Sequence, residues 1–323
     1  MRTLIVGCGY VGLPLGAELA RQGHEVFGLR RSAAAANEMK SVGIRPLVGD
    51  VTRLETLAEL PRRFDWVVNC VSAGGGADNY NYRQIYLDGN RNLVSWLAES
   101  PPKKFIYTSS TNVYGQNDGS VVTESSPVEP EAETSKILAA AEKVLLEAAG
   151  GSGTGVPPVR TETHGRDARA TIFPAVILRV AGIYGPERGH WFRQFLRDEA
   201  RIEGNGSRFL NMIYRDDVAG CIITALEKGR AGEIYNAVDD EPVSQIDFFR
   251  WLAATLGKPL PPSVSEDAGI VRKRGATNKR VSNQKLKIEL GHQFMHPTFR
   301  SGCGAEISRL KCAGALPAGP DAR

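Results

Sequence analysis

Long apolar runs, metal-binding cysteine pairs and a marked excess of one charge sign are all missing from this chain of 323 residues. The longest uncharged run, residues 3–17, is interrupted by four glycines and one proline, so it is too short to span a bilayer and unlike a cleavable signal peptide. The five cysteines include no Cys-x-x-Cys pair, which favours reduced, packed thiols over a metal or redox site. These absences predict a cytoplasmic protein without a membrane segment.

The charge of the chain is nearly balanced, with 40 Lys and Arg against 36 Asp and Glu. A surplus of four is too small to indicate binding to nucleic acid or to an anionic membrane surface. Apolar residues make up 42% and charged residues 24%, as in ordinary globular proteins, which excludes wholesale disorder. The length predicts about two domains, and we expect a small-molecule substrate as the partner.

Short apolar runs alternate with longer helical patterns, which is typical of βαβ units and a mostly parallel sheet. Strands are expected at residues 3–6, 25–29, 45–48, 66–69, 104–109 and 175–180. Helices are expected at residues 11–22, 33–42, 54–60, 82–99 and 131–149. The pattern predicts an α/β fold with a Rossmann-type doubly wound parallel sheet, whose ligand crevice lies beyond the carboxyl ends of the strands.

Beyond residue 180 the alternation loosens, which predicts a small C-terminal substrate lobe. Its expected elements are a strand at 233–237 that returns to the sheet and helices at 216–227, 244–256 and 283–290. We therefore expect the Rossmann-type domain at 1–180, the substrate lobe at 181–311 and a disordered tail at 312–323. Residues 150–171 show neither a strand nor a helix period and begin with Gly and Pro, which predicts an inserted mobile loop.

The first expected strand runs into a glycine-rich turn, GCGYVG at residues 7–12, that opens a helix. Gly7 permits the tight turn, Gly9 lets a pyrophosphate approach the backbone, and Gly12 lets helix and strand pack closely. The phosphates then lie on the helix N-terminus beside Tyr10 and Val11. This context predicts dinucleotide binding, and the alternative is a glycine-rich turn with no ligand.

The residues after the second expected strand separate two cofactors. NAD sites usually place an Asp or Glu there to accept from the ribose 2′-hydroxyl, but this sequence has Arg30 and Arg31. A guanidinium clamps a 2′-phosphate with charge-assisted hydrogen bonds, whereas a carboxylate repels it. The sequence therefore favours NADP over NAD, and the alternative is two surface arginines without a ligand.

Six segments of the chain form an ordered set: GCGYVG (7–12), GDV (49–51), YTSSTNVYG (107–115), LRVAGIYGPER (178–188), DDVA (216–219) and YNAVDDEP (235–242). The extended and atypical short-chain dehydrogenase/reductases carry similar segments in this order, so the chain resembles that group, the NAD-dependent epimerase/dehydratase family. The resemblance implies that Asp50 contacts the adenine beside Val51, that Val71 and Ser72 line the cofactor, and that residues 184–186 begin the substrate side.

Members of this family commonly pair two helices into a four-helix interface, so the resemblance implies a homodimer through residues 82–99 and 131–149. The apolar residues of these segments exceed what one sheet face needs: Leu93, Trp96, Leu97, Leu138, Val144 and Leu145.

A competing resemblance comes from residues 7–15 (GCGYVGLPL), which are similar to the start of nucleotide-sugar 6-dehydrogenases with a catalytic cysteine and NAD. Those enzymes are longer and carry an acidic residue where Arg30 stands.

Proton chemistry in the epimerase/dehydratase family depends on a Tyr-x-x-x-Lys pair on the helix after the fifth strand. The resemblance places the lysine at Lys136 and the tyrosine at Ala132, so the tyrosine is missing. Lys136 is expected beside the cofactor, with a solvated lysine as the alternative. Ser110 matches the upstream hydroxyl that binds the substrate oxygen, with a turn-capping role as its alternative. Other candidate proton donors are Tyr114, Tyr184, Glu131 and Glu133.

Seven basic residues and no acidic residue lie between positions 268 and 288: Arg272, Lys273, Arg274, Lys279, Arg280, Lys285 and Lys287. A solvated face is the usual explanation, but such a patch also suits an anionic substrate such as a nucleotide diphosphate sugar.

The sequence leaves two functions open: an NADP-dependent oxidoreductase or epimerase acting on a carbonyl or sugar-like substrate, and a non-catalytic NADP(H)-binding sensor. The first function leads, because the fold and its crevice are those of catalysts. The missing tyrosine is the strongest support for the sensor, and the fold alone does not choose between them.

Overall fold

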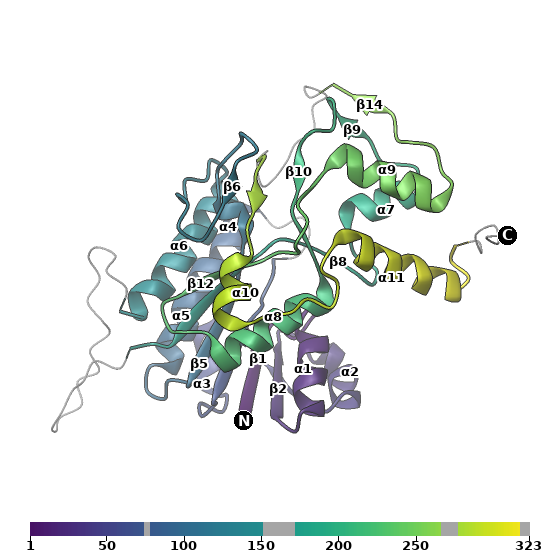
Figure 1. Ribbon diagram of the computed structural model, residues 1–323. Coiled ribbons are helices and arrows are strands. Elements are labelled where there is room, and N and C mark those ends of the chain that lie inside the picture. Colours follow the sequence, from purple (N-terminus) through teal and green to yellow (C-terminus); the bar gives the residue numbers. More distant parts are fainter. Residues whose placement is uncertain (74–77, 151–171, 266–276, 317–323) are drawn as a thin grey trace.

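The computed structural model describes residues 1–73, 78–150, 172–265 and 277–316. Figure 1 shows a layered α/β body and a smaller lobe that carries the helices at residues 190–196, 245–256 and 299–312. Residues 151–171 of the expected mobile loop and residues 317–323 of the expected tail lie outside the described residues.

A seven-stranded parallel sheet forms the centre of the body, in the order β12-β7-β5-β4-β1-β2-β3. Its strands are β1 (Arg2–Val6), β2 (Glu25–Arg30), β3 (Ile44–Val48), β4 (Trp66–Asn69), β5 (Lys104–Ser110), β7 (Ala175–Val180) and β12 (Ile234–Ala237). Val6 pairs with Leu29 on one side and with Asn69 on the other, so three strands end at the same edge. This topology confirms the predicted Rossmann-type α/β fold, including the returning seventh strand.

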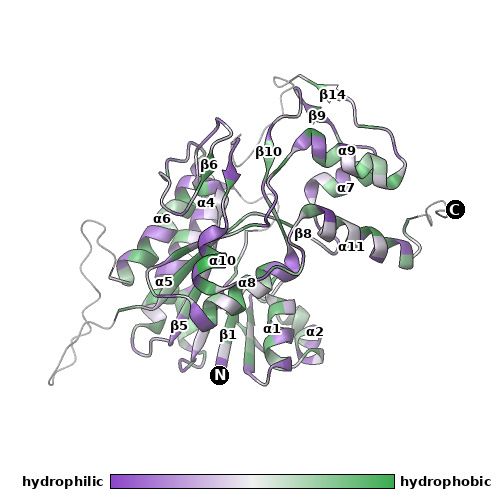
Figure 2. Ribbon diagram, in the orientation of Figure 1, coloured by the Kyte–Doolittle hydropathy of each residue, from purple (hydrophilic) through white to green (hydrophobic). Residues whose placement is uncertain are grey.

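Helices cover both faces of the sheet (Figure 1). One layer contains α1 (Gly12–Arg21), α2 (Ala36–Ser41), α8 (Arg215–Lys228) and α10 (Gln284–Leu290). The other contains α3 (Leu54–Ala58), α4 (Asn79–Arg83), the π-turn η2 (Gln84–Asp88), α5 (Gly89–Leu97) and α6 (Glu133–Ala148). Helix α1 buries Gly12, Leu15, Gly16 and Leu19, a spacing that gives one apolar face. Figure 2 shows hydrophobic and hydrophilic residues alternating along these helices.

The second lobe has its own apolar core. It contains α7 (His190–Leu196), β9 (Ile202–Glu203), β10 (Phe209–Leu210), β13 (Val243–Ser244), α9 (Gln245–Leu256), β14 (Ser263–Val264) and α11 (Phe299–Cys312). Phe195, Phe248 and Phe299 lie at its centre. Between Ile213 and Val238, the buried apolar residues belong to the core of the body instead. Tyr214 is the exception, because it packs in the core of the second lobe. The lobe therefore takes up less of the chain than residues 181–311.

The short strands β8 (Gly182–Tyr184) and β11 (Met212–Tyr214) pair in parallel where the chain passes from the body to the lobe. A further parallel pair, β6 (Val121–Val122) with β15 (Arg280–Val281), joins a loop of the body to a late segment of the chain. Because these strands are two or three residues long, no periodicity in the sequence marks them.

Helix α11 reaches Cys312, and the following turn ends with Leu316 packed against the core of the second lobe. The disordered tail was therefore predicted to begin too early. The sequence pattern missed this helix because its apolar side is a narrow row of Phe299, Cys303 and Ile307, interrupted by Gly302 and Gly304. Tertiary contacts stabilise it, since a weakly amphipathic sequence of this length is marginal alone.

Most apolar residues that suggested a dimer are used within one chain. Leu93, Trp96, Leu97, Leu138 and Leu145 are buried in the core of the body. They cannot also supply an exposed face to a partner, so the homodimer depends on the family resemblance alone.

Within the described residues, none of the helices is both long enough and apolar enough to cross a membrane.

Candidate functional site

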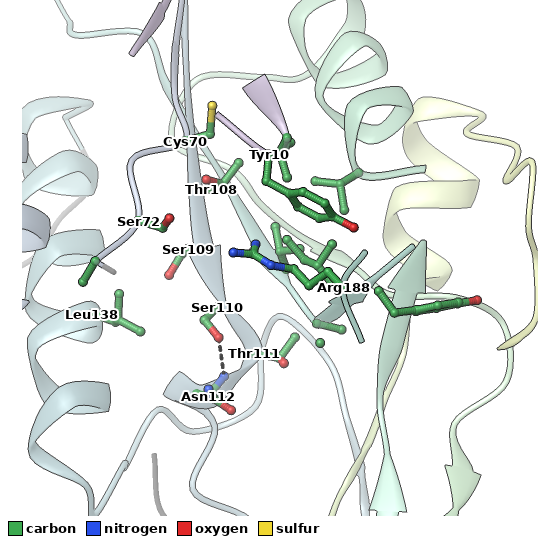
Figure 3. A pocket seen from close by; sticks show the side chains of 18 of the residues that line it. Tyr10, Cys70, Ser72, Thr108, Ser109, Ser110, Thr111, Asn112, Leu138 and Arg188 are labelled. Carbon is green, nitrogen blue, oxygen red and sulfur yellow. Dashed lines mark hydrogen bonds between the residues drawn. The ribbon is translucent and has the colours of Figure 1, made fainter. Parts of the chain in front are cut away.

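A pocket of about 1210 Å³ runs from the glycine-rich turn, across the carboxyl ends of β4 and β5, into the second lobe. Figure 3 shows side chains from both parts of the molecule pointing into it, among them Tyr10, Ser110 and Arg188. The position is the one predicted for the crevice, because the strand order reverses where β1 lies beside β4.

The glycine-rich turn fits a dinucleotide pyrophosphate. Gly7 has φ +83°, and a Cβ on it would lie 2.7 Å from the backbone of Val71, so only glycine fits. A Cβ on Gly12 would lie 2.8 Å from the Gly7 carbonyl oxygen and 2.9 Å from Ile5. A Cβ on Gly9 would meet no atom closer than 3.9 Å, which leaves open space above the backbone. This space is what a phosphate approaching a helix N-terminus requires.

The residues predicted to bind the adenosine half of the cofactor also line the pocket. Arg30, Arg31, Asp50 and Val51 all line it, as does Ser32. Arg30 is 3.9 Å from Glu38, while Asp50 accepts hydrogen bonds from the backbone and hydroxyl of Thr52. Among the described residues, Arg31 has no carboxylate partner within 4.0 Å.

The middle of the pocket contains the predicted Val71, Ser72 and Ser110. Ser110 ends β5, and its hydroxyl accepts a hydrogen bond of 3.2 Å from the backbone of Asn112 (Figure 3). Thr108, Ser109, Thr111 and Asn112 line the same wall. Ser110 therefore caps the following turn and also faces the pocket, and its contact with a substrate oxygen stays a prediction.

Helix α6 presents a different pair of residues to the pocket from the one expected. Thr134 and Leu138 line it, one helical turn apart. Lys136 does not: its side chain is 56% exposed and lies 4.0 Å from Glu133. Residues two apart on a helix point about 200° apart, so Thr134 and Lys136 cannot share a face. Ala132 is the N-cap residue of α6 and also lies outside the pocket.

The other candidate proton donors differ in their surroundings. Glu131 and Glu133 are exposed and outside the pocket. Tyr114 is fully buried and donates to the side-chain oxygen of Asn236, 2.8 Å away, so it packs below the pocket. Tyr184 lines the pocket, and its hydroxyl has no partner among the described residues. Burial raises the pKa of Tyr184 far above its usual range, which keeps its proton in place.

A buried ion pair supports the wall formed by β5. Arg179 and Glu142 are 3–4% exposed and are 2.7 Å apart. The Ser109 hydroxyl donates to Glu142, and the Arg179 guanidinium lies 4.7 Å above the ring of Tyr114. Loss of either charge would leave the other buried and unpaired, so this network fixes the position of the strand that carries Ser109 and Ser110.

In the folded chain, the basic residues of the patch at 272–287 lie in different surroundings. Lys279 turns into the pocket and is 3% exposed, and its ammonium donates to the carbonyl of Tyr114 and the hydroxyl of Thr277, each at 2.8 Å. Lys285 and Lys287 pair with Glu233 and Asp240 instead. Arg280 is exposed and donates to the carbonyl of Gly119, whereas residues 272–274 lie outside the described residues.

The lobe end of the pocket contains two cations, Lys279 and the half-buried Arg208, and one carboxylate, Glu203, which lies 3.7 Å from Arg208. Burial, with the nearby charge of Arg208, lowers the pKa of Lys279 to about 8. No carboxylate within the described parts of the chain pairs with Lys279. A buried charge normally has a partner of opposite sign, so this end of the pocket suits an anion.

Several residues of the pocket were not predicted as site residues: Thr134, Leu138, Arg188, His190 and Arg208. Of these, Arg188 belongs to the YGPER segment, which marked the substrate side without assigning a role to the arginine. The spacing of four between Thr134 and Leu138 predicts that they share one face of α6. The sequence does not tell which face of the helix meets the pocket, because that depends on packing. Within the described ranges, no group of three His, Cys, Asp or Glu side chains is arranged to hold a metal ion.

Fold and pocket together define an NAD-binding Rossmann protein with a second, smaller lobe. The chain belongs to the NAD-dependent epimerase/dehydratase family, whose family model matches residues 3–237. That match supports the main resemblance over the one to nucleotide-sugar 6-dehydrogenases. A curated relative, protein YeeZ of Escherichia coli K12, is 28% identical over 309 residues, which cover 92% of this chain and 96% of YeeZ.

Solved structures agree with this assignment. A putative NAD-dependent epimerase/dehydratase from Methylobacillus flagellatus is 31% identical and superposes with a TM-score of 0.71, over 96% of this chain and 98% of that one. DesIV, a dTDP-glucose 4,6-dehydratase of Streptomyces venezuelae solved with NAD and TYD bound, superposes with a TM-score of 0.78 at 20% identity. The superposition covers 98% of this chain and 99% of DesIV, and at that identity it shows the fold alone.

Proposed function

We propose that the protein is an NADP(H)-dependent oxidoreductase or epimerase that acts on an anionic carbonyl or nucleotide-sugar-like substrate. The observation that carries the proposal is the continuity of the pocket, which joins the glycine-rich turn and Arg30 at one end to Lys279 and Arg208 at the other. A bound nicotinamide supplies hydride chemistry in such a site. Lys279, which has no carboxylate partner among the described residues, is suited to the charged part of a substrate.

The chain's own residues would divide the remaining work. The backbone of Gly9 and the start of α1 bind the pyrophosphate, and Arg30 and Arg31 bind a 2′-phosphate. Ser110, at the end of β5, hydrogen-bonds a substrate oxygen, which its position in the pocket lining supports. NADP is favoured over NAD by the two arginines, although the fold relative DesIV holds NAD.

The test is a titration of the purified protein with NADPH, followed by turnover assays on carbonyl compounds and sugar nucleotides. We expect NADPH fluorescence to change on binding and an anionic substrate to be turned over faster than its neutral analogue. Failure to bind either NADPH or NADH would contradict the proposal.

A second candidate, a non-catalytic NADP(H) sensor, is favoured by one observation. The face of α6 that meets the pocket carries Thr134 and Leu138, so neither a phenol nor an ammonium stands where this family places its proton-transfer pair. Tight NADPH binding without turnover of any carbonyl or sugar nucleotide would support the sensor over the enzyme.

The homodimer is retained as part of the proposal from the family resemblance alone. Static light scattering at micromolar concentration decides it, since one chain has a mass of 35.0 kDa and a dimer twice that. A monomeric mass would remove the dimer and leave the rest of the proposal intact.

A further inference from the structure

The glycine-rich turn is tied directly to the second lobe through Tyr10. Its hydroxyl donates to the carbonyl of Pro186 at 3.0 Å. Its ring is flanked by two guanidinium groups, those of Arg188 and Arg215, whose central carbons lie 4.4 Å and 5.5 Å from the ring centre. Burial raises the pKa of Tyr10 to about 12, so the phenol keeps the proton that it donates. The turn that would hold the phosphates thus contacts the lobe that would hold the substrate.

Arg188 is held in place by a tight turn. The backbone of Gly185 and the backbone of Arg188 donate to each other's carbonyls, at 3.2 Å and 3.0 Å. Glu187, inside this turn, has φ +61°, in the left-handed region that favours glycine. Such a conformation costs free energy for a residue with a Cβ. The turn therefore presents Arg188 in a defined position at a cost to stability.

The two arginines beside Tyr10 differ in their partners. Arg215 is neutralised by Asp216, 2.7 Å away. Among the residues that the structure describes, no carboxylate lies within 4.0 Å of the Arg188 guanidinium. Arg188 lines the same pocket as Gly7, Gly9 and Val11. Figure 3 shows its guanidinium reaching past the Tyr10 ring toward the wall formed by Thr108 and Ser109.

We propose that Arg188 hydrogen-bonds the pyrophosphate of the bound dinucleotide from the side of the second lobe. The phosphates are then held between the backbone N–H groups of the glycine-rich turn and a guanidinium that the other lobe supplies. The inference deepens the proposed function and depends on it, because it requires a dinucleotide in the pocket. Its chemical basis is that a guanidinium without a carboxylate partner, beside a phosphate-binding backbone, gains charge-assisted hydrogen bonds when the anion arrives.

The position of Arg188 separates its role from that of the two arginines after β2. Arg30 and Arg31 follow the second strand, where the ribose 2′ position is read. Arg188 stands over Tyr10, beside the turn itself. Loss of Arg188 is therefore expected to weaken every ligand that contains the pyrophosphate, whether or not it carries a 2′-phosphate.

The experiment measures the affinities of four ligands by isothermal titration calorimetry: NADPH, NADH, ADP-ribose and adenosine 2′-monophosphate. Arg188→Gln should weaken NADPH, NADH and ADP-ribose by a similar factor, between about tenfold and about a hundredfold. Adenosine 2′-monophosphate lacks the pyrophosphate, so its affinity should stay within about twofold. Arg188→Lys should recover part of the loss, because it keeps the charge without the bidentate geometry.

The matched control is Arg197→Gln, which removes the same charge from an exposed position of the same lobe, outside the pocket. It should leave all four affinities unchanged. Unchanged ADP-ribose and NADH affinities in Arg188→Gln would overturn the assignment, and a raised substrate KM alone would show that Arg188 binds the substrate instead. If wild-type protein binds none of the three pyrophosphate ligands, the proposed function itself fails and the assignment falls with it.

Discussion

Thr134 and Lys136 lie on opposite faces of helix α6: Thr134 lines the pocket, whereas the Lys136 side chain is 56% exposed and reaches Glu133. The order of the family's segments matches the sequence on both sides of Lys136, yet the helix turns this lysine outward. Charge at an exposed position contributes little to binding at a site on the other side of a helix.

The first prediction tests this orientation. Lys136→Tyr should leave NADPH affinity within about twofold of wild type, because the new ring points into solvent. Thr134→Tyr should weaken NADPH by about tenfold or more, because the ring enters the pocket. Circular dichroism spectra serve as the control for folding, and fluorescence titration gives the affinities. A loss of affinity in Lys136→Tyr but not in Thr134→Tyr would restore the original placement of Lys136 beside the cofactor.

The second prediction concerns cofactor choice. Arg30→Ala combined with Arg31→Ala should weaken NADPH by about tenfold to a hundredfold, since hydrogen bonds to a charged phosphate are lost. NADH has no 2′-phosphate, so its affinity should change by less than about twofold. Arg53→Ala is the control, because Arg53 is exposed, pairs with Glu55 and lies outside the pocket. Equal losses for NADH and NADPH would count against the assignment.

The third prediction follows from the buried Lys279. Its pKa is lowered from 10.5 to about 8 in the folded protein, so between these values the unfolded chain binds more protons. Stability should therefore rise as pH increases through this window, by up to about 3 kcal/mol, because the cost of burying the charge disappears. Urea unfolding at pH 7.5 and pH 9.5 measures the change.

Lys279→Met removes the titrating group and should flatten this rise. The comparison of slopes matters more than absolute stability, because the variant also loses the hydrogen bond to the carbonyl of Tyr114. The same pH dependence in wild type and Lys279→Met would show that other groups cause it.

The fourth prediction concerns residues 151–171. The chain ends that flank them lie together, since the backbone of Phe173 donates to the carbonyl of Ala148 at 3.0 Å. Replacement of these residues by Gly-Ser-Gly-Ser should leave the melting temperature equal or higher, because each halving of a loop saves about 0.6 kcal/mol of closure entropy. NADPH affinity should not change. A melting temperature lowered by more than about 5 °C would show that the segment contributes to stability.

Strand positions were predictable because each buried parallel strand is a short apolar run covered on both faces by helices. The segment 66–69 (WVVN) is fully buried in β4, and its predicted bounds are those of the strand. Residues 82–99 were harder: the single expected helix consists of α4, which begins at Asn79, the π-turn η2 and α5. Side-chain periodicity gives no signal for an i to i+5 turn within an otherwise helical segment.

By itself the sequence determined the sheet, the glycine-rich turn and the position of Arg30, because these depend on local patterns of apolar residues, glycine and charge. Only the tertiary structure decided which lysine enters the pocket. Lys136 matches a family motif but faces solvent, and Lys279 belongs to a charged run but is buried. The direction of a side chain depends on which face of its segment packs against the rest of the chain, and that packing joins residues distant in sequence.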